Sequence, residues 1–513
     1  VGGCPGVGAP DPWGLRGGPG LGFGAPNPVA RSARSTNREV IPGSILRFVA
    51  IVWFVTLGFA LTARAEDQSP HQTTGTRVGE VTESSAILWT RLTAHPNRVV
   101  QDSARPGESE VDRLEGACPG AAGRVRVRLA TRADLSDAVA TEWVDVGPAN
   151  DSIHQFPLTG LKPSTVYHYE VETSGPGGSP RHGGFQGTFQ TADPPEARTD
   201  LRFCVMTCQG YHDRGHPDGH AIYPAMRALK PRFVALTGDL VYYDNDEPRA
   251  VNARLARYHW ERMFSLPRLV EFQREVAAYW LKDDHDTLNN DSWPGARMGD
   301  FTFAQGQAIF RQQAPTADGP PYRTFRHGRD LQIWLTDGRD FRSPNRMPDG
   351  PDKTIWGAEQ KAWFFRTMKA SDATWKVLIS PTPLVGPDRV GKNDNHANAG
   401  FQSEGDEIRG WLRGNAPDDA FVICGDRHWQ YHSVHPQTGL NEFGVGAASD
   451  EHAGGTPGEN KTYHRFHRPK GGFLSVTVRP DGPSSVIRFE HRDTTGNVVY
   501  SWERRRTPAS GPE

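Results

Sequence analysis

The segment FVALTGDLVY, residues 233–242, is an apolar run that ends in a Gly-Asp pair and is followed by a tyrosine. A second segment, FVICGDRH at residues 421–428, again ends an apolar run in Gly-Asp and adds a histidine. Short apolar runs of this kind are typical of buried strands, and ligands gather at the carboxyl ends of strands in open α/β sheets. We therefore expect Asp239 and Asp426 to reach one site, with a structural Asp that caps a helix or turn as the alternative for each.

The chain after Asp200 alternates apolar runs with stretches in which apolar residues recur every three or four positions. That alternation is typical of strands and helices packed in an α/β layer fold. The strands are expected at 201–206, 233–236, 331–335, 375–379 and 420–424, with closing strands at 473–478 and 486–490. The helices are expected at 250–264, 268–279 and 358–370.

A different pattern precedes this region. Apolar and polar residues alternate with a period of two at 85–90, 125–129 and 167–171, which predicts half-buried strands. Several short strands at close intervals indicate a β-sandwich of the fibronectin or immunoglobulin-like kind. Prolines near residue 194 mark a linker. We therefore expect a β-sandwich domain at 66–193 and an α/β domain at 194–513.

The first 65 residues are expected to lie outside both domains. Residues 1–46 are rich in Gly and Pro and begin with Val, which predicts a disordered or artefactual extension. Residues 47–65 contain an apolar stretch that ends in small residues, which indicates a signal peptide cleaved after Ala65. The stretch is shorter than the ~20 apolar residues of a membrane span, so an anchor is the less favoured alternative. A secreted, periplasmic or cell-surface protein without a stable membrane span is expected.

The charge balance removes one class of partner. The 513 residues include 58 Lys and Arg against 60 Asp and Glu, so no overall charge favours nucleic acid or an anionic membrane. The four cysteines after residue 65, at 118, 204, 208 and 424, are too few for a disulfide scaffold, although single bridges stay open. The number of cysteines therefore does not show their role, which must be inferred from where each lies in the sequence.

A third polar segment, DDHD at residues 283–286, follows another apolar run. Three carboxylates and an imidazole so close together repel one another unless a cation or a buried network compensates them, and a solvated acidic loop is the alternative. Alternate residues of an extended segment point the same way, so Asp426 and His428 can address one site. Because the three segments belong to one α/β unit, we interpret them as one metal site.

These segments resemble those of the PhoD-like alkaline phosphatases, a family of the calcineurin-like metallophosphoesterase superfamily, over nearly the whole mature chain. VMTCQ at 205–209 is similar to the family's first strand, and DDHD takes the place of the superfamily's Gly-Asn-His-Asp/Glu motif. The resemblance implies a four-layer α/β (α+β) metallophosphoesterase-type sandwich. It also implies metal ligation by Cys208, Asp239, Tyr242, Asp284, Asp426 and His428.

By the same resemblance, Asp239 bridges two metals, with Fe³⁺ and Ca²⁺ expected first and Mn²⁺ or Zn²⁺ as alternatives, because ligand type narrows the metal only loosely. His285 is expected as the general acid, with Asp284 and Arg339 as further catalytic residues. Arg339 would either bind phosphate through two donors or pair with nearby carboxylates. Lys282 departs from the family, which usually has Trp or a similar residue there, and is expected to perturb the loop.

The resemblance implies an exported hydrolase of phosphate esters of the alkaline phosphatase D type, acting on monoesters, diesters or both through a hydroxide activated by two metals. Its partner would be a small-molecule phosphate ester, and we expect a monomer. Two alternatives stay open. One is a phospholipase-like phosphodiesterase with the same metals, and the other is a non-catalytic extracellular binding protein whose motifs have degenerated.

Overall fold

The computed structural model describes residues 70–100, 109–178, 181–198, 200–416 and 418–507. The predicted extension at 1–46 and the predicted signal peptide at 47–65 lie outside the described residues. The described residues belong to one compact unit, Ala65–Glu513. Among them, no helix combines the length and the apolar character that crossing a membrane requires.

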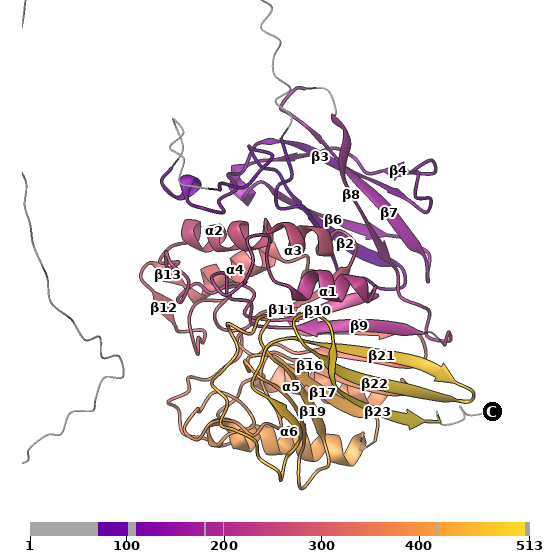
Figure 1. Ribbon diagram of the computed structural model, residues 1–513, viewed down its shortest axis with the longest axis vertical. Helices are drawn as coiled ribbons and strands as arrows, with labels where there is room; N and C mark the ends of the chain where they lie inside the picture. Colours follow the sequence, from indigo (N-terminus) through magenta and orange to yellow (C-terminus); the bar gives the residue numbers. More distant parts are fainter. Residues whose placement is uncertain (1–69, 101–108, 179–180, 199, 417, 508–513) are drawn as a thin grey trace, which may run out of the picture. The chain divides into compact units, whose positions relative to one another are not determined.

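The larger sheet has nine strands and extends across both predicted domains. In spatial order they are β23 (Val498–Arg506), β22 (Ser484–Arg492), β21 (Phe473–Asp481), β9 (Leu201–Met206), β10 (Phe233–Thr237), β11 (Ala277–Leu281), β1 (Thr76–Gly79), β2 (Ser85–Arg91) and β6 (Ile153–Thr159). Strands β9, β10 and β11 run parallel. The C-terminal strands, yellow in Figure 1, join the sheet where β21 pairs antiparallel with β9.

The second sheet has seven strands. In spatial order they are β14 (Arg323–His327), β15 (Leu331–Leu335), β16 (Trp375–Ser380), β17 (Ala420–Cys424), β19 (Asn441–Val445), β18 (Gln430–Val434) and β20 (His464–Arg468). Strands β15, β16, β17 and β19 run parallel. Their carboxyl ends therefore lie at one edge of the sheet.

The two sheets pack face to face, because successive residues of a strand point to opposite faces. Ala235 of β10 joins Val377 and Ile423 of the second sheet in one apolar core, while Val234 and Leu378 face outward into separate cores. The outer faces are covered by helices (Figure 1): α1 (Ile222–Ala228), α2 (Ala253–Phe264), α3 (Pro267–Gln273) and α4 (Phe303–Gln313) on the first, and α5 (Gly357–Ala370) and α6 (Gln402–Asn415) on the second.

The N-terminal strands form a second β layer. A five-stranded sheet is made of β3 (Gly123–Ala130), β4 (Val139–Ala140), β5 (Val144–Val146), β7 (Val166–Ser174) and β8 (Arg181–Gln190). Its apolar face, including Val127 and Val171, packs with Leu88 of β2 and Leu158 of β6. Since β1 also pairs with β11, the N-terminal strands and the α/β region share the larger sheet. A remaining hairpin joins β12 (Arg297–Met298) to β13 (Phe301–Thr302).

The helix expected at 268–279 is wrong in its second half. Helix α3 ends at Gln273 and β11 begins at Ala277. Leu269, Phe272 and Val276 share one core and have helical spacing, so periodicity alone continues the helix. The run from Ala277 is instead buried on both faces between β10 and β1, which favours a strand. The helices expected at 250–264 and 358–370 are observed as α2 and α5.

Candidate metal centre

The polar segments found in the sequence all follow parallel strands of the two packed sheets. Cys208 follows β9, Asp239 follows β10 and Asp283 follows β11, while Asp426 follows β17 of the second sheet. Because parallel strands end at the same edge, the four segments meet where the two sheets abut. All four side chains are buried or nearly so.

Three of these strand-end residues have an unusual backbone. Cys208, Asp239 and Asp426 have φ angles of 51°, 55° and 62°, in the left-handed region that residues other than glycine rarely enter. Such conformations store strain and cluster at functional sites, where the surrounding structure holds them in place. The turn after each strand is therefore held in a conformation that the surrounding fold must stabilise.

The glycine of each Gly-Asp pair has a packing reason. A Cβ on Gly238 would lie 2.5 Å from the Cβ of Asp283, and Gly238 itself has a φ of 94°. A Cβ on Gly425 would lie 2.6 Å from Oγ1 of Thr237 and 2.7 Å from Oγ1 of Thr207. The strand ends thus approach one another too closely for any side chain at these positions.

Asp239 lies at the centre of the site. It belongs to each of three groups of possible metal-binding atoms, and within each group the atoms lie within 4.8 Å of one another. The first group joins it to Cys208 and His428. The thiol of Cys208 and the hydroxyl of Tyr242 each lie 3.5 Å from Oδ2 of Asp239, and that hydroxyl is also 3.5 Å from Nε2 of His428.

The other two groups bring in further carboxylates. One joins Asp239 to Asp284 and His285, and the other joins it to Asp283 and Asp426. The six expected ligands therefore lie around one point. Asp283 is an additional carboxylate, because no ligand role is expected for it from the sequence. Its role could have been found from the sequence, because Asp283 is a carboxylate at the position where the superfamily motif has Gly.

Burial sets the protonation tendencies of this cluster. It raises the pKa of Asp239 well above its usual range, and the neighbouring charge of Asp284 raises it further. It raises the pKa of Asp426 to about 6 despite Arg427, and it raises the pKa of the Cys208 thiol and of the Tyr242 phenol. Because burial opposes ionisation of these donors, their anionic forms need a compensating positive charge, and a bound cation provides it. The residues thus fit a metal site.

The donors fall into two chemical sets around Asp239. Cys208, Tyr242 and His428 offer sulfur, phenol oxygen and imidazole nitrogen, which suit a transition metal. The carboxylates Asp284 and Asp426 offer oxygen alone, which suits a harder ion such as Ca²⁺. The residues around Asp239 therefore offer two chemically different sets of donors that share one carboxylate.

Arg339 pairs with local carboxylates, which is one of the two arrangements expected for it. Its buried guanidinium binds Asp283 through Nε, and NH2 lies 3.4 Å from Oδ2 of Asp284. Burial acts to raise the pKa of Asp284, but Arg339 and then His285 outweigh it, so the pKa falls below its usual range. Arg339 thus keeps Asp284 ionised and oriented.

Lys282, the departure from the family pattern, is buried and pairs with two other carboxylates. Its ammonium contacts Asp337 and lies 2.7 Å from Oδ1 of Asp340. Oδ1 of Asp337 accepts hydrogen bonds from the backbone N–H groups of Arg339 and Asp340. Lys282 therefore fixes the turn that carries Arg339.

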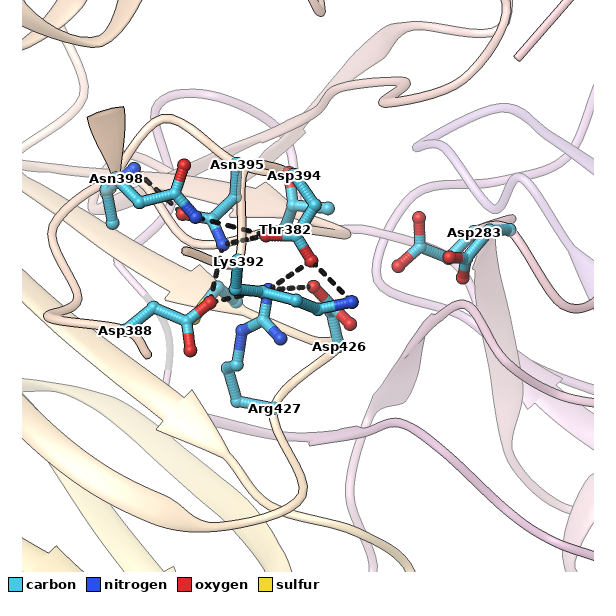
Figure 2. A network of polar contacts seen from close by, with 12 residues as sticks. Asp283, Thr382, Asp388, Lys392, Asp394, Asn395, Asn398, Asp426 and Arg427 are labelled. Atoms are coloured by element: carbon cyan, nitrogen blue, oxygen red, sulfur yellow. Dashed lines mark hydrogen bonds and ion pairs between the residues drawn. The ribbon is translucent and has the colours of Figure 1, made fainter. Parts of the chain in front are cut away.

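On the side of the second sheet, Arg427 gathers three carboxylates (Figure 2). Its NH2 lies 2.6 Å from Asp426, 3.0 Å from Asp388 and 3.1 Å from Asp394. Lys392 lies 3.0 Å from Asp394 and extends the network. Asp426 is thus held by a cation of its own, which fixes its orientation in the site.

His285 is held by a carboxylate of its own. Its Nδ1 lies 2.6 Å from Oδ1 of Asp244, and its backbone N–H donates to Asp239 at 3.4 Å. Burial acts to lower the pKa of His285, but Asp284 and Asp239 outweigh it and raise the pKa to about 10. The imidazole is therefore suited to carry a proton at the edge of the site.

Comparison with known proteins places the chain in a family. Residues 203–470 match the family model described as PhoD-like phosphatase, and residues 58–193 match the model of the N-terminal domain of these phosphatases. Alkaline phosphatase D of Bacillus subtilis (strain 168) is 23% identical over 423 residues, which are 72% of this chain and 66% of that protein. The chain thus spans just under two thirds of that relative's length.

Solved structures agree on the fold. The structure of PhoD has a TM-score of 0.65 at 18% identity and covers 86% of this chain and 91% of its own. The purple acid phosphatase PPD1 from yellow lupin has a TM-score of 0.58 at 13% identity and covers 85% of this chain and 74% of its own. Together with the family models, which match more than half of the residues, these findings show that the chain belongs to the PhoD-like phosphatases.

Proposed function

We propose that the protein is an exported, metal-dependent hydrolase of phosphate esters of the alkaline phosphatase D type. The observation that carries this proposal is the position of Asp239, which belongs to all three groups of possible metal-binding atoms. A carboxylate shared in this way suits a centre of two cations, which is the arrangement that phosphoryl transfer uses. Membership of a phosphatase family supports it.

In this proposal the two donor sets hold different metals, with Fe³⁺ and Ca²⁺ as the first expectation and Mn²⁺ or Zn²⁺ as alternatives. Cys208, Tyr242 and His428 would hold one cation together with Asp239. Asp284 and Asp426 would hold the other, also with Asp239, while Asp283 stands beside them. When bound, such a pair supplies an activated nucleophile and neutralises the charge that develops on the phosphoryl group.

The protein's own residues supply the proton that the leaving group needs. Asp244 binds Nδ1 of His285, so Nε2 is the ring nitrogen left to face a substrate. The His285 side chain is 10% exposed, which is enough to contact a bound ester at the edge of the site. His285 would donate its proton to the departing alkoxide, and Asp244 would keep the ring in the required orientation.

His285→Asn is expected to retain its metals and lose activity in proportion to the basicity of the leaving group. For alkyl phosphates we expect about a hundredfold fall in kcat, which lies at the lower end of general-acid effects, and a smaller fall for a nitrophenyl ester. Steady-state kinetics on both esters, with metal content by elemental analysis, measure this. His168→Asn, on β7 of the N-terminal sheet, is the control. Equal losses on both esters would argue against a proton-donor role.

Removal of the metals by a chelator is expected to destabilise the protein, and re-addition to restore it. At a hundredfold excess of free metal over Kd, binding contributes about 2.7 kcal/mol. The pKa of Asp426 in the metal-free protein is about 6, above its ordinary value, because of burial. Below that pH the cation must displace a proton, so the stabilisation by metal shrinks as the pH falls from 8 to 5. Thermal unfolding with and without chelator checks this, and a metal-independent melting temperature would contradict it.

The substrate is proposed to be a small-molecule phosphate ester, hydrolysed by a monomer outside the cytoplasm. A nitrophenyl monoester and the corresponding diester, assayed before and after chelation, would separate a phosphatase from a phospholipase-like phosphodiesterase. Failure to hydrolyse either ester with added metals would favour the non-catalytic binding protein. Sequencing the N-terminus of the secreted form would test cleavage after Ala65.

The domain organisation is part of the proposal. A fibronectin- or immunoglobulin-like sandwich is proposed at 66–193 and the metallophosphoesterase domain at 194–513, with His285 and Asp284 as catalytic residues and Arg339 as the residue that positions Asp284. The N-terminal family model ends at residue 193 and the phosphatase model begins at residue 203, which supports this boundary. The apolar core between the five-stranded sheet and strands β1, β2 and β6 supports a sandwich.

A further inference from the structure

A second histidine–carboxylate pair, His452 and Asp213, lies beside the proposed metal centre and contacts Tyr242. His452 places Nε2 2.8 Å from the Tyr242 hydroxyl and Nδ1 2.7 Å from Oδ2 of Asp213. Its ring centroid is 4.9 Å from that of Tyr242 and 4.4 Å from that of His428. Tyr242 thus has His452 as a neighbour in addition to His285, whose ring lies 4.5 Å away.

The loop that carries His452 is anchored on two of the proposed ligands. Ala448 donates its backbone N–H to the carbonyl oxygen of Cys208, and Gly454 donates to that of His428. The His452 N–H itself donates to Oγ of Ser449 at 3.2 Å. The imidazole is therefore placed by the same strand ends that carry the metal-binding side chains.

Gly210 provides the space that this pair occupies. A Cβ on Gly210 would lie 2.8 Å from both Nδ1 of His452 and Oδ2 of Asp213, closer than real contacts allow. The residue follows Cys208 by two positions. The φ of Gly210 is not in the left-handed region, so backbone conformation does not require glycine here. The close approach of the histidine–carboxylate pair does.

The hydrogen bonds fix the direction of the phenol. An ionised carboxylate only accepts, so Nδ1 of His452 carries the hydrogen that Asp213 binds. In the tautomer with its hydrogen on Nδ1, Nε2 accepts, and Tyr242 donates its O–H to it at 2.8 Å. The O–H of Tyr242 therefore has three possible acceptors, and His452 at 2.8 Å is the nearest, since Asp239 and His428 both lie 3.5 Å from the phenol oxygen.

We propose that His452, oriented by Asp213, is a positioning residue that presents the phenol oxygen of Tyr242 to the metal centre. The inference rests on the proposed metal centre and adds a role that the sequence did not assign to His452 or Asp213. It accounts for the 13% exposure of the His452 side chain, which lies beside the ligands rather than in solvent. By contrast, His216 and Asp218 form a surface pair at 3.7 Å with side chains 46% and 57% exposed.

The test is the affinity of the chelator-stripped protein for Zn²⁺, measured against a competing chelator in the full-length protein. His452→Phe keeps a ring that packs on His428 but removes both hydrogen bonds. We expect it to weaken Zn²⁺ binding about 10- to 100-fold, as is usual for partners of metal ligands. Asp213→Asn, at a partly exposed position, should shift affinity in the same direction with less risk to folding. His216→Phe should bind like the unmodified protein.

A double-mutant cycle separates positioning from a general structural effect. If His452 acts through Tyr242, adding His452→Phe to Tyr242→Phe should weaken Zn²⁺ binding no further, because the group it positions is already gone. Thermal unfolding of the stripped variants shows that each is folded. Losses that add in the double variant, or unchanged affinity in both single variants, would overturn this inference alone. An unmodified protein that binds no Zn²⁺ would overturn the metal centre together with it.

Discussion

Asp239→Asn is expected to give a folded protein that has lost its metals and about a thousandfold or more of its activity. Asp239 belongs to all three groups of possible metal-binding atoms among the described residues, so its loss would affect both proposed cations. The transition-state stabilisation that a metal centre supplies is several kcal/mol, and about 4 kcal/mol corresponds to a thousandfold in rate. Elemental analysis and hydrolysis of a nitrophenyl phosphate measure the two losses.

The same substitution should not harm the metal-free fold. The pKa of Asp239 is raised by burial and by Asp284, so the ionised carboxylate destabilises the folded state above its ordinary pKa. That penalty is absent at low pH and grows as the pH rises towards the folded-state pKa. The neutral amide removes it, so at pH 7 the stripped variant should melt no lower than the stripped unmodified protein. Asp218→Asn, an exposed substitution, is the control. Retained metals and activity would sink the proposed centre.

Lys282→Met is expected to lower the free energy of unfolding by about 3–5 kcal/mol. Burial acts to lower the pKa of Lys282, but Asp337 and Asp340 outweigh it and raise the pKa, so the ammonium stays charged between them. Removal of the cation leaves two carboxylates with side-chain exposures below 10% next to each other without the ammonium that neutralises them, and only Arg311, 4.0 Å from Asp340, remains as a cationic neighbour among the ion pairs of the described residues. Urea unfolding of the metal-free protein measures the loss.

A matched set of variants separates the charge effect from packing. Lys282→Met combined with Asp337→Asn and Asp340→Asn should recover most of the stability, because the amides still accept hydrogen bonds and no unpaired charge remains. Arg227→Met, which breaks an exposed pair with Glu275, should change stability by less than about 1 kcal/mol. A loss of that small size in Lys282→Met would show that the buried ion triad is not needed.

The centre of the site could be predicted because it depends on local patterns. An apolar run that ends in Gly-Asp specifies a buried strand and a tight turn in the same few residues. The sequence therefore predicts strands β10 and β17 together with the positions of Asp239 and Asp426. The strand at 201–206 is not followed by Gly-Asp, and its largely apolar run alone predicts its observed bounds. The residue after each strand is where the chemistry is found.

What the sequence could not supply was the pairing of distant segments. Nothing local in the loop at 450–454 shows that His452 would meet Tyr242, because their contact depends on how two loops cross in space. Whether Arg339 would face substrate or Asp283 depended equally on tertiary contacts. The helix extended over Val276 failed because helical spacing and a strand buried on both faces look alike in a short apolar run.

The shared nine-stranded sheet has a consequence for how this protein can be cut or recombined. β11, which leads into the acidic loop, has β10 on one flank and β1 on the other, with Gly79 opposite Ala278. A fragment that starts at residue 194 would leave one flank of β11 bare and open to pairing with foreign strands. The N-terminal segment is therefore structural support for the catalytic half, and grafting it from a relative would succeed only where this register is matched.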